Sequence, residues 1–344
     1  MSGAVAWIGN VVQAAKEAEA LGYDSIWMQD RSLTQTRDNY RNHLVCGSVE
    51  DIDPNGDPNF FEPLTSMAAL SVLTSSIRIG TAVLQLPLYN PILLAKQAAN
   101  IDALSAGRLN LGVGIGTGIS FARQGFDNLH FPFHERGKIF DEYLTAILQL
   151  WRSDSPSSFK GKYIQFSNLE LFPKPSSLKL FLGSGVAEKG LRRVVEFGNG
   201  VILPYRNPAE SKASVLRIRN AMQKRGKEPG QIEIAQTIYT SVGRESAEAR
   251  ALLYPTIAAR AKGFVGKGMS TDDQTAPSKH VLSADDFFDM SLVGTPQEIV
   301  KQVETFQEAG IDHLIMVLIF RGTKVSSLID TLKTFAREII PSFH

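Results

Sequence analysis

Short apolar segments alternate with amphipathic helical segments along almost the whole chain. Seven predicted strands cover 23–28, 77–84, 109–115, 178–182, 200–204, 232–241 and 313–319. From the second onward they are mostly short, apolar and β-branched, as expected for strands covered on both faces, and repeated strand–helix alternation predicts a parallel sheet. An eighth strand would close a (β/α)8 TIM barrel, which is the α/β fold class that we predict. A doubly wound open sheet is the alternative.

The only candidate for the eighth strand is residues 4–8. It is short and lies almost against the first predicted helix, residues 10–21, so we expect the first strand to be short or truncated. The same stretch could instead open that helix. A single barrel domain over residues 1–344 suits the length of the chain.

Three insertion loops interrupt the predicted barrel, at 32–60, 117–134 and 263–290. They lack a regular apolar period, and segments of this length without structure of their own are commonly functional. We interpret them as substrate walls and a lid.

Composition narrows the class of protein. With 43% hydrophobic and 21% charged residues the chain has ample material for a core, and a net charge of +1 gives no field that favours nucleic acid or a membrane surface. The single cysteine, Cys46, excludes an intrachain disulfide and fits a cytoplasmic location. No apolar run is long enough for a bilayer and no signal peptide is evident. The six histidines lack metal-ligand spacing, so we expect no metal site.

One predicted strand, residues 109–115, carries glycines on one face. Gly112, Gly114 and Gly116 alternate with apolar residues and leave a smooth strip. The strip fits a ligand lying over the strand end or close packing inside a narrow barrel, and the pattern favours neither. The spacing is not that of a dinucleotide fingerprint, because Thr117 and Ile119 occupy the positions of the last glycine.

A second glycine-rich turn follows the strand at 178–182. Gly183, Ser184 and Gly185 come directly before a predicted helix, where free backbone N–H groups and the helix dipole favour an anion such as phosphate. Ser184 could bind phosphate or cap the helix, and an ordinary N-cap is the alternative. We favour phosphate because this strand comes late in the barrel.

Several short motifs together resemble the bacterial luciferase-like monooxygenase family. They occur in the family's order and span nearly the whole chain: residues 18–27, 77–83, 90–97, 104–109, 135–137 and 292–296. The family includes FMN-dependent monooxygenases and oxidoreductases that use the deazaflavin coenzyme F-420. Each motif is weak alone, but their combination is specific.

The resemblance implies a flavin-type cofactor at the carboxyl ends of the barrel strands. It also implies a non-prolyl cis peptide at Ala82–Val83, with Gln85 facing the ring and the glycine strand beside it. The cofactor-binding residues that follow are Asp30, Ala82, Val83, Gln85, Gly114, Gly116, Thr117, Gly183, Ser184, Gly185, Val186 and Ala187.

Several residues differ from the family pattern, and this limits which of the family's catalytic roles can be assigned to this chain. Asp30-Arg31 stands where many members have an acid followed by histidine, so the catalytic residue stays unassigned. Ile115 replaces the phosphate-contacting arginine of bacterial luciferase, and Thr117 replaces a catalytic glutamate of a sugar-phosphate dehydrogenase, so neither activity is carried over. The predicted substrate contacts are Arg31, His43, Arg123 and His134.

The function that follows is a flavin-dependent oxidoreductase acting on a small organic substrate with reduced flavin and oxygen. The alternatives are hydride transfer with coenzyme F-420, a non-catalytic flavin-binding barrel, and a flavin-free lyase or isomerase. FMN and F-420 share one scaffold, so the sequence leaves the cofactor undecided. The resemblance implies a flavin reductase as a partner, and family members commonly form homodimers through early helices. Here this would be the helix carrying Met67 and Leu70, with a place in the core as the alternative for these two residues.

Overall fold

The computed structural model describes residues 8–30, 61–116, 120–264, 283–318 and 325–343. Arg31, His43, Cys46 and Thr117 lie outside these ranges, as does the whole of the insertion at 32–60. Residues 4–7 of the candidate first strand are also outside them.

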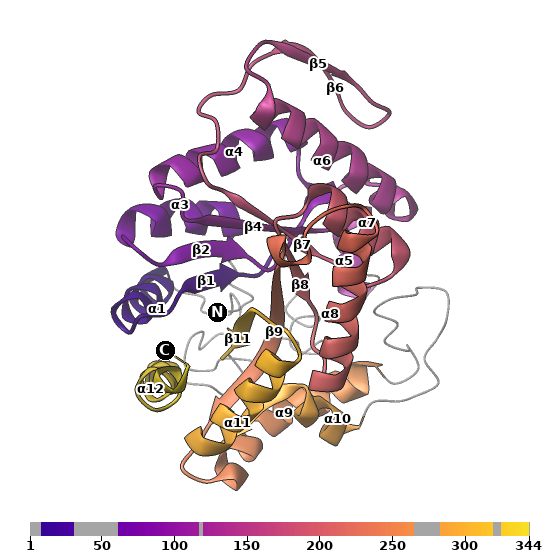
Figure 1. Ribbon diagram of the computed structural model, residues 1–344. Helices are drawn as coiled ribbons and strands as arrows, with labels where there is room; N and C mark the ends of the chain where they lie inside the picture. Colours follow the sequence, from indigo (N-terminus) through magenta and orange to yellow (C-terminus); the bar gives the residue numbers. More distant parts are fainter. Residues whose placement is uncertain (1–7, 31–60, 117–119, 265–282, 319–324, 344) are drawn as a thin grey trace.

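A mainly parallel sheet nearly closes into a barrel with helices around it, so the predicted fold class is confirmed (Figure 1). The strands follow the order β1-β2-β4-β7-β8-β9, with β10 and β11 both paired to β9 and the short β3 paired to β4. Their bounds are β1 Ser25–Met28, β2 Arg78–Thr81, β3 Leu84–Gln85, β4 Leu109–Gly114, β7 Lys179–Gly183, β8 Gly200–Leu203, β9 Glu233–Val242, β10 Ser291–Gly294 and β11 His313–Val317.

Helices follow the strands and cover the outside of the sheet (Figure 1). Several begin at a sequence-encoded cap: Asn90 precedes α4, and Asn207 and Thr295 form capping boxes before α8 and α11, each followed by proline. The helix bounds are α1 Ile8–Ala20, α3 Pro63–Leu73, α4 Pro91–Leu104, α6 Arg136–Arg152, α7 Glu188–Phe197, α8 Pro208–Gln223, α9 Ser246–Phe264, α11 Pro296–Glu308 and α12 Val325–Glu338.

Two of the predicted irregular insertions contain regular structure. Helix α5, Ser120–Asn128, lies within 117–134 and is followed by a short 3-10 turn, Phe133–Glu135. Within 263–290, α9 continues to Phe264 and α10 spans Ala284–Asp289. Strand β10 comes next and was not predicted, because it directly follows the segment assigned to the insertion at 263–290 and overlaps the motif at 292–296. The predicted hairpin near Phe159 and Phe166 is present as β5, Ser157–Lys160, and β6, Gln165–Leu169.

The barrel interior is filled by large and small residues facing each other across neighbouring strands. Trp27, Phe181 and Ile202 form an interior cluster with Ala235 and Ile315. The partner of Trp27 on β2 is a glycine, and the partner of Phe181 on β8 is another. Since a bulky ring occupies the space beside each glycine, the interior is solid, as in other barrels of this class.

The amino-terminal end of the barrel carries a layer of polar side chains. Ser25 Oγ lies 2.9 Å from His313 Nε2 and accepts a hydrogen bond from Trp27 Nε1 at 2.8 Å. Glu233 pairs with Lys179 at 2.8 Å and lies 3.5 Å from the other ring nitrogen of His313. Burial lowers the pKa of His313, and the Glu233 carboxylate opposes part of that effect.

The ring of strands is interrupted between β1 and β11, and we call this interruption the seam. In the described part of the chain no backbone hydrogen bond joins the two strands. Side chains connect the two sides instead: Tyr23 donates to the carbonyl of Leu332 at 2.9 Å, and Lys333 pairs with Glu17 at 3.3 Å. Ile8 opens α1, so the part of the candidate first strand that the structure describes is helical, because the α1 pattern extends back to it.

Candidate functional site

The carboxyl ends of β2, β4 and β7 meet at a bulge between β2 and β3. The peptide bond Ala82–Val83 in this bulge is cis, which confirms the prediction. Gly114 at the end of β4 pairs with Gly183 at the end of β7, and with Gln85 on its other side. These three segments therefore form one continuous surface.

Close packing accounts for the glycines along β4. A β-carbon on Gly114 would lie 2.8 Å from Cγ2 of Val83, and one on Gly112 would overlap the carbonyl of Thr81. A β-carbon on Gly183 would also lie 2.8 Å from Val83. The space beside these glycines is thus filled by the bulge itself, which is the second of the two interpretations left open by the sequence.

Gln85 presents an unpaired oxygen at this surface. Its backbone N–H donates to Asp30 Oδ2 at 2.9 Å, which joins the bulge to the residue after β1. Its side-chain Oε1 is buried, and among the described residues it has no hydrogen-bond partner. A β-carbon on Gly116 would lie 3.1 Å from this oxygen, so the two residues face each other. A buried carbonyl oxygen without a donor is costly, and a ligand N–H or O–H would satisfy it.

Gly116 turns the chain away from β4 towards α5. Its φ of +79° is left-handed, which glycine adopts without strain. The ring of Phe126, from α5, would lie 2.9 Å from a β-carbon at this position. Phe126 is fully buried and makes an edge contact with Phe133 at 5.3 Å between ring centroids. The aromatic rings of Phe126 and Phe133 therefore bound the surface on the side of α5.

The predicted substrate contacts Arg123 and His134 come together around Phe133. The Arg123 guanidinium lies 5.4 Å from the ring centroid, and His134 makes an edge contact at 5.8 Å. Both side chains are exposed, and Arg123 also lies 3.9 Å from Asp127. Arg136, which is 8% exposed, covers the Phe133 ring at 4.0 Å. The contacts to substrate remain a prediction.

The turn after β7 has the geometry of an anion cradle. Helix α7 begins at Glu188, and its N-cap Ala187 provides no side-chain hydrogen bond to the first turn. Ser184 does not cap the helix: its Oγ donates to the carbonyl of Gly185 at 2.8 Å. A β-carbon on Gly190 would overlap this turn, so glycine lets it pack against the helix. The N–H groups of the first turn receive no side-chain cap, and the dipole adds positive potential there.

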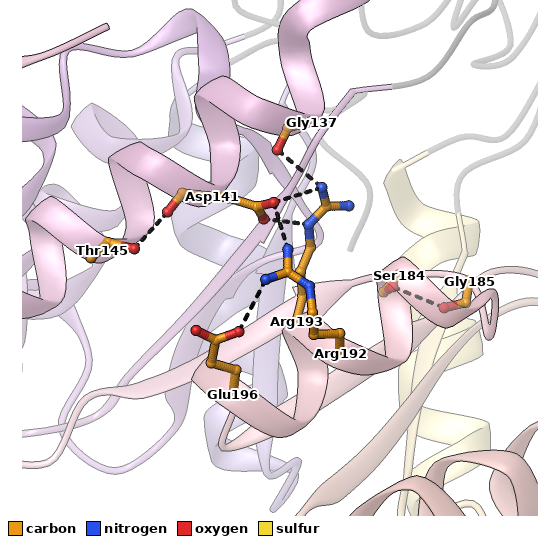
Figure 2. A network of polar contacts seen from close by, with 8 residues as sticks. All are labelled: Gly137, Asp141, Thr145, Ser184, Gly185, Arg192, Arg193 and Glu196. Carbon is orange, nitrogen blue, oxygen red and sulfur yellow. Dashed lines mark hydrogen bonds and ion pairs between the residues drawn. The ribbon is translucent and has the colours of Figure 1, made fainter. Parts of the chain in front are cut away.

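Helix α7 is fixed to α6 by one carboxylate and two arginines (Figure 2). Asp141 Oδ1 accepts from Arg193 Nε at 2.5 Å, and its Oδ2 accepts from Arg192 Nη2 at 2.7 Å. Arg193 also donates to the carbonyl of Gly137 at 3.0 Å. Because Arg193 is largely buried, these charge-assisted bonds hold the start of α7 in a defined place.

The family follows from a comparison of sequences. The family profile described as luciferase-like monooxygenase matches residues 2–313 of the chain. The chain belongs to the luciferase-like monooxygenase family. It is an oxidoreductase family, as the resemblance implied.

Individual relatives of this luciferase-like chain agree with that assignment. A protein of Mycobacterium bovis, without an assigned function, is 30% identical over 217 residues, which are 63% of this chain and 72% of the relative. An F-420-dependent secondary alcohol dehydrogenase, solved with an F-420–acetone adduct, superposes with a TM-score of 0.76 and 22% identity, over 98% of this chain and 95% of its own. The oxygenating constituent of 3,6-diketocamphane monooxygenase from Pseudomonas putida, solved with FMN, gives 0.72 and 16%, over 98% and 93%.

Sequence reasoning missed several residues that shape this luciferase-like site. Phe126 and Phe133 lie in the segment 117–134, which was predicted to be irregular. Arg136 lies in the Glu-Arg-Gly motif at 135–137, but sequence reasoning assigned it no role in the site. Asp141 and Arg193 lie on amphipathic helices, where a charged residue is ordinarily solvated. Within the described ranges no cluster of metal-ligating side chains occurs, and no helix is long and apolar enough to cross a membrane.

Proposed function

We propose that the chain is a flavin-dependent oxidoreductase that acts on a small organic substrate with reduced FMN and oxygen. The observation that carries the proposal is the Oε1 of Gln85, which is buried beside Gly116 at the carboxyl end of the barrel and has no hydrogen-bond partner among the described residues. A flat ring with polar edges would supply the donor that this oxygen lacks.

The residues present fit a phosphorylated flavin-type group. The ring end would lie against Ala82, Val83 and Gln85, with Asp30 holding the Gln85 backbone from behind. The phosphate would bind the turn from Gly183 to Ala187, where the first N–H groups of α7 have no side-chain cap. Gly114 and Gly183 are register partners, so both ends of such a group would rest on neighbouring strands.

The bound flavin and the protein would contribute different parts of the reaction. When bound, the flavin supplies two-electron transfer and, in its reduced form, reactivity towards oxygen. The chain's own residues bind and orient: Gln85 would accept one hydrogen bond at the ring edge, and α7 would fix the phosphate. The aromatic wall of Phe126 and Phe133 would exclude water from one side, and Arg123 and His134 would contact the substrate at its rim.

Hydride transfer with the deazaflavin F-420 is the second candidate function. The F-420-dependent dehydrogenase superposes with the higher TM-score of the two structures compared above, 0.76 against 0.72. Ile115 also stands where bacterial luciferase has an arginine for the phosphate of FMN. The residues around Gln85 would fit the ring of FMN or the ring of F-420.

Titration of the protein with FMN, riboflavin and F-420, followed by absorbance and fluorescence, tests the proposal. FMN binding at least about tenfold tighter than riboflavin would support both the ring site and the phosphate cradle, since one phosphate interaction contributes about 1.4 kcal/mol or more. Binding of F-420 alone would assign hydride transfer. Binding of none of the three by a folded sample would overturn the cofactor assignment.

The remaining parts of the proposal concern partners. A flavin reductase would supply reduced FMN, since the chemistry with oxygen requires flavin in its reduced form. A homodimer would form through α3 and α4. Met67 and Leu70, named from sequence for this contact, are buried in the core at 0% and 1% exposure. The exposed large apolar residues there are Val72 and Leu73 on α3 and Leu93 and Leu104 on α4. The single cysteine supports a cytoplasmic protein.

A further inference from the structure

The interior side chains of the barrel form layers, and the register of the strands shows which residue belongs to which layer. The middle layer is the cluster of Trp27, Phe181, Ile202, Ala235 and Ile315. Ala235 on β9 is the register partner of Ile202 on β8, so both side chains point into the barrel. Side chains alternate between the two faces of a strand. Counting along β9 from Ala235 therefore identifies the interior residues that lie above this layer, towards the carboxyl end.

Thr237 is the first interior residue of β9 above the middle layer. Its register partner on β11 is Ile315, which belongs to the middle-layer cluster, and this agrees with an interior position for the Thr237 side chain. Ala82 and Val83 of the bulge also pack against that cluster, and both are partly exposed. Strands β4, β7 and β8 separate β2 from β9 in the strand order. Thr237 and the bulge therefore border the carboxyl end of the barrel interior from opposite sides of the ring.

The hydroxyl of Thr237 is accessible to a ligand. The interior residues before and after it on β9, Ala235 and Tyr239, are 0% and 2% exposed, whereas Thr237 is only half-buried. Within the described ranges no hydrogen bond is recorded for its hydroxyl. Since the layer below it is solid, the exposed part of Thr237 faces the carboxyl end of the barrel, where barrels of this class bind their ligands.

The side chains beside this hydroxyl carry no full charge. Above the middle layer, the interior positions of the described strands β9 and β11 are occupied by Thr237, Tyr239 and Val317, and none of these has a carboxylate, ammonium or guanidinium group. Tyr239 stacks on Tyr205, which follows β8, with 4.5 Å between ring centroids. A charged molecule would lose its hydration here without meeting an opposite charge, which is costly. This side of the barrel end therefore suits a neutral molecule.

We propose that Thr237 binds the substrate, and that the substrate is a small neutral molecule with a carbonyl or hydroxyl oxygen. The inference rests on the proposed flavin function, because it places the substrate between a ring at the Ala82–Val83 bulge and the opposite side of the barrel. A threonine hydroxyl donates to a carbonyl oxygen and donates to or accepts from a hydroxyl, so it fits both groups. The apolar part of the substrate would lie against Val317 and Tyr239. A single hydrogen bond would then orient the oxygen-bearing carbon.

Three variants separate the hydroxyl of Thr237 from its shape and its strand. Thr237→Val removes the hydroxyl and keeps the branched shape, whereas Thr237→Ser keeps the hydroxyl. Thr240→Val makes the same change on the opposite, outward face of β9, where Thr240 is 0% exposed. Because no described residue loses a hydrogen bond in Thr237→Val, its midpoint of urea unfolding should equal that of the unchanged chain. A lower midpoint in Thr237→Val and in Thr237→Ser alike would indicate a packing role and overturn the proposal.

The probe is cyclohexanone, and protonated cyclohexylamine and cyclohexanecarboxylate are charged counterparts with the same ring. Their dissociation constants are measured by NMR titration of the FMN-loaded protein. We expect the unchanged chain, Thr237→Ser and Thr240→Val to bind cyclohexanone equally. Thr237→Val should bind it about tenfold more weakly, because the ketone oxygen loses its donor. The two charged probes should bind the unchanged chain at least about tenfold more weakly than cyclohexanone does.

Titration of each variant with FMN distinguishes this inference from the proposed function. FMN should bind all four proteins equally. If FMN binds but cyclohexanone does not, or if Thr237→Val binds cyclohexanone as the unchanged chain does, the role of Thr237 is overturned and the flavin function stands. Tighter binding of either charged probe would overturn the neutral substrate class. Failure of the folded, unchanged chain to bind FMN would overturn the proposed function and this inference with it.

Discussion

Val83 and Gly183 share one space at the carboxyl end of the barrel: a β-carbon on Gly183 would lie 2.8 Å from Cγ2 of Val83. We therefore expect Gly183→Ala to lower the free energy of unfolding by about 1–3 kcal/mol, because the surrounding strands leave little room to shift. Denaturant unfolding measures this loss. Val83→Ala should relieve it, so the double variant should be more stable than the sum of the single effects. Strict additivity would contradict the shared space.

Gln85→Leu should separate folding from cofactor binding. Leucine removes the buried Oε1, which has no hydrogen-bond partner in the described part of the chain, so the free energy of unfolding should stay equal or rise by up to about 1 kcal/mol. The dissociation constant for the flavin-type cofactor should increase by about tenfold, since one hydrogen bond is lost. Gln307→Leu, at an exposed position of α11, is the control and should change neither quantity. An unchanged dissociation constant in Gln85→Leu would remove this residue from the cofactor site.

The carboxylate of Glu19 makes stability depend on pH. Burial raises its pKa, but hydrogen bonds from the backbone N–H groups of Ser76, Ile77 and Ser75 outweigh that effect and lower the pKa to about 2. This folded-state pKa lies below the ordinary value of 4.5. The contribution of Glu19 to stability is therefore complete above pH 4.5 and is lost as the pH falls towards 2.

Glu19→Gln should reveal this dependence. Glutamine keeps the shape of the side chain but loses its charge. We therefore expect the free energy of unfolding at pH 7 to be about 1 kcal/mol lower in the variant than in the unchanged chain. The difference from the unchanged chain should shrink between pH 4.5 and 2 in urea titrations. Glu304→Gln, at an exposed position with no salt bridge or side-chain hydrogen bond recorded in the described structure, should show no such trend. A difference that is independent of pH would contradict the assignment.

Val72→Lys should weaken the proposed homodimer. Val72 is 62% exposed near the end of α3, and Leu104 is 54% exposed at the end of α4. A charge at the centre of an apolar contact would shift the protein towards the monomer in light scattering after size exclusion. Leu216→Lys, 54% exposed on α8, is the matched control and should leave the oligomeric state unchanged. Dissociation by the control alone would place the contact elsewhere.

The fold was predictable because most strands contain branched apolar residues between clear helix signals. Glu62-Pro63 and Asn90-Pro91 mark the starts of α3 and α4, and both helices are present there. The strand β10 was missed because it directly follows the segment assigned to the insertion at 263–290, and its residues 292–294 were assigned only to a family motif. Helix α5 was missed because its sequence mixes polar residues with a glycine, and only contacts such as those of Phe126 stabilise it.

The candidate site was less predictable than the fold. The glycines at 112, 114 and 183 stood out in the sequence, but the residues that fill the space beside them, Thr81 and Val83, come from a bulge much earlier in the chain. No local sequence pattern predicts that Thr81 and Val83 contact these glycines. The fixing of α7 by Asp141 depends equally on which faces of α6 and α7 meet, and that is decided by packing.

The position of the seam has a consequence for how the protein tolerates damage at its ends. Going round the ring from the seam, β4 and β7 are the third and fourth strands, and each is paired on both sides. Loss of residues near either terminus would loosen β1, β11 and the helices beside them first. Strands β4 and β7, which carry Gly114 and Gly183, lie farther round the ring, so a shortened chain should lose order at β1 and β11 before it loses order there.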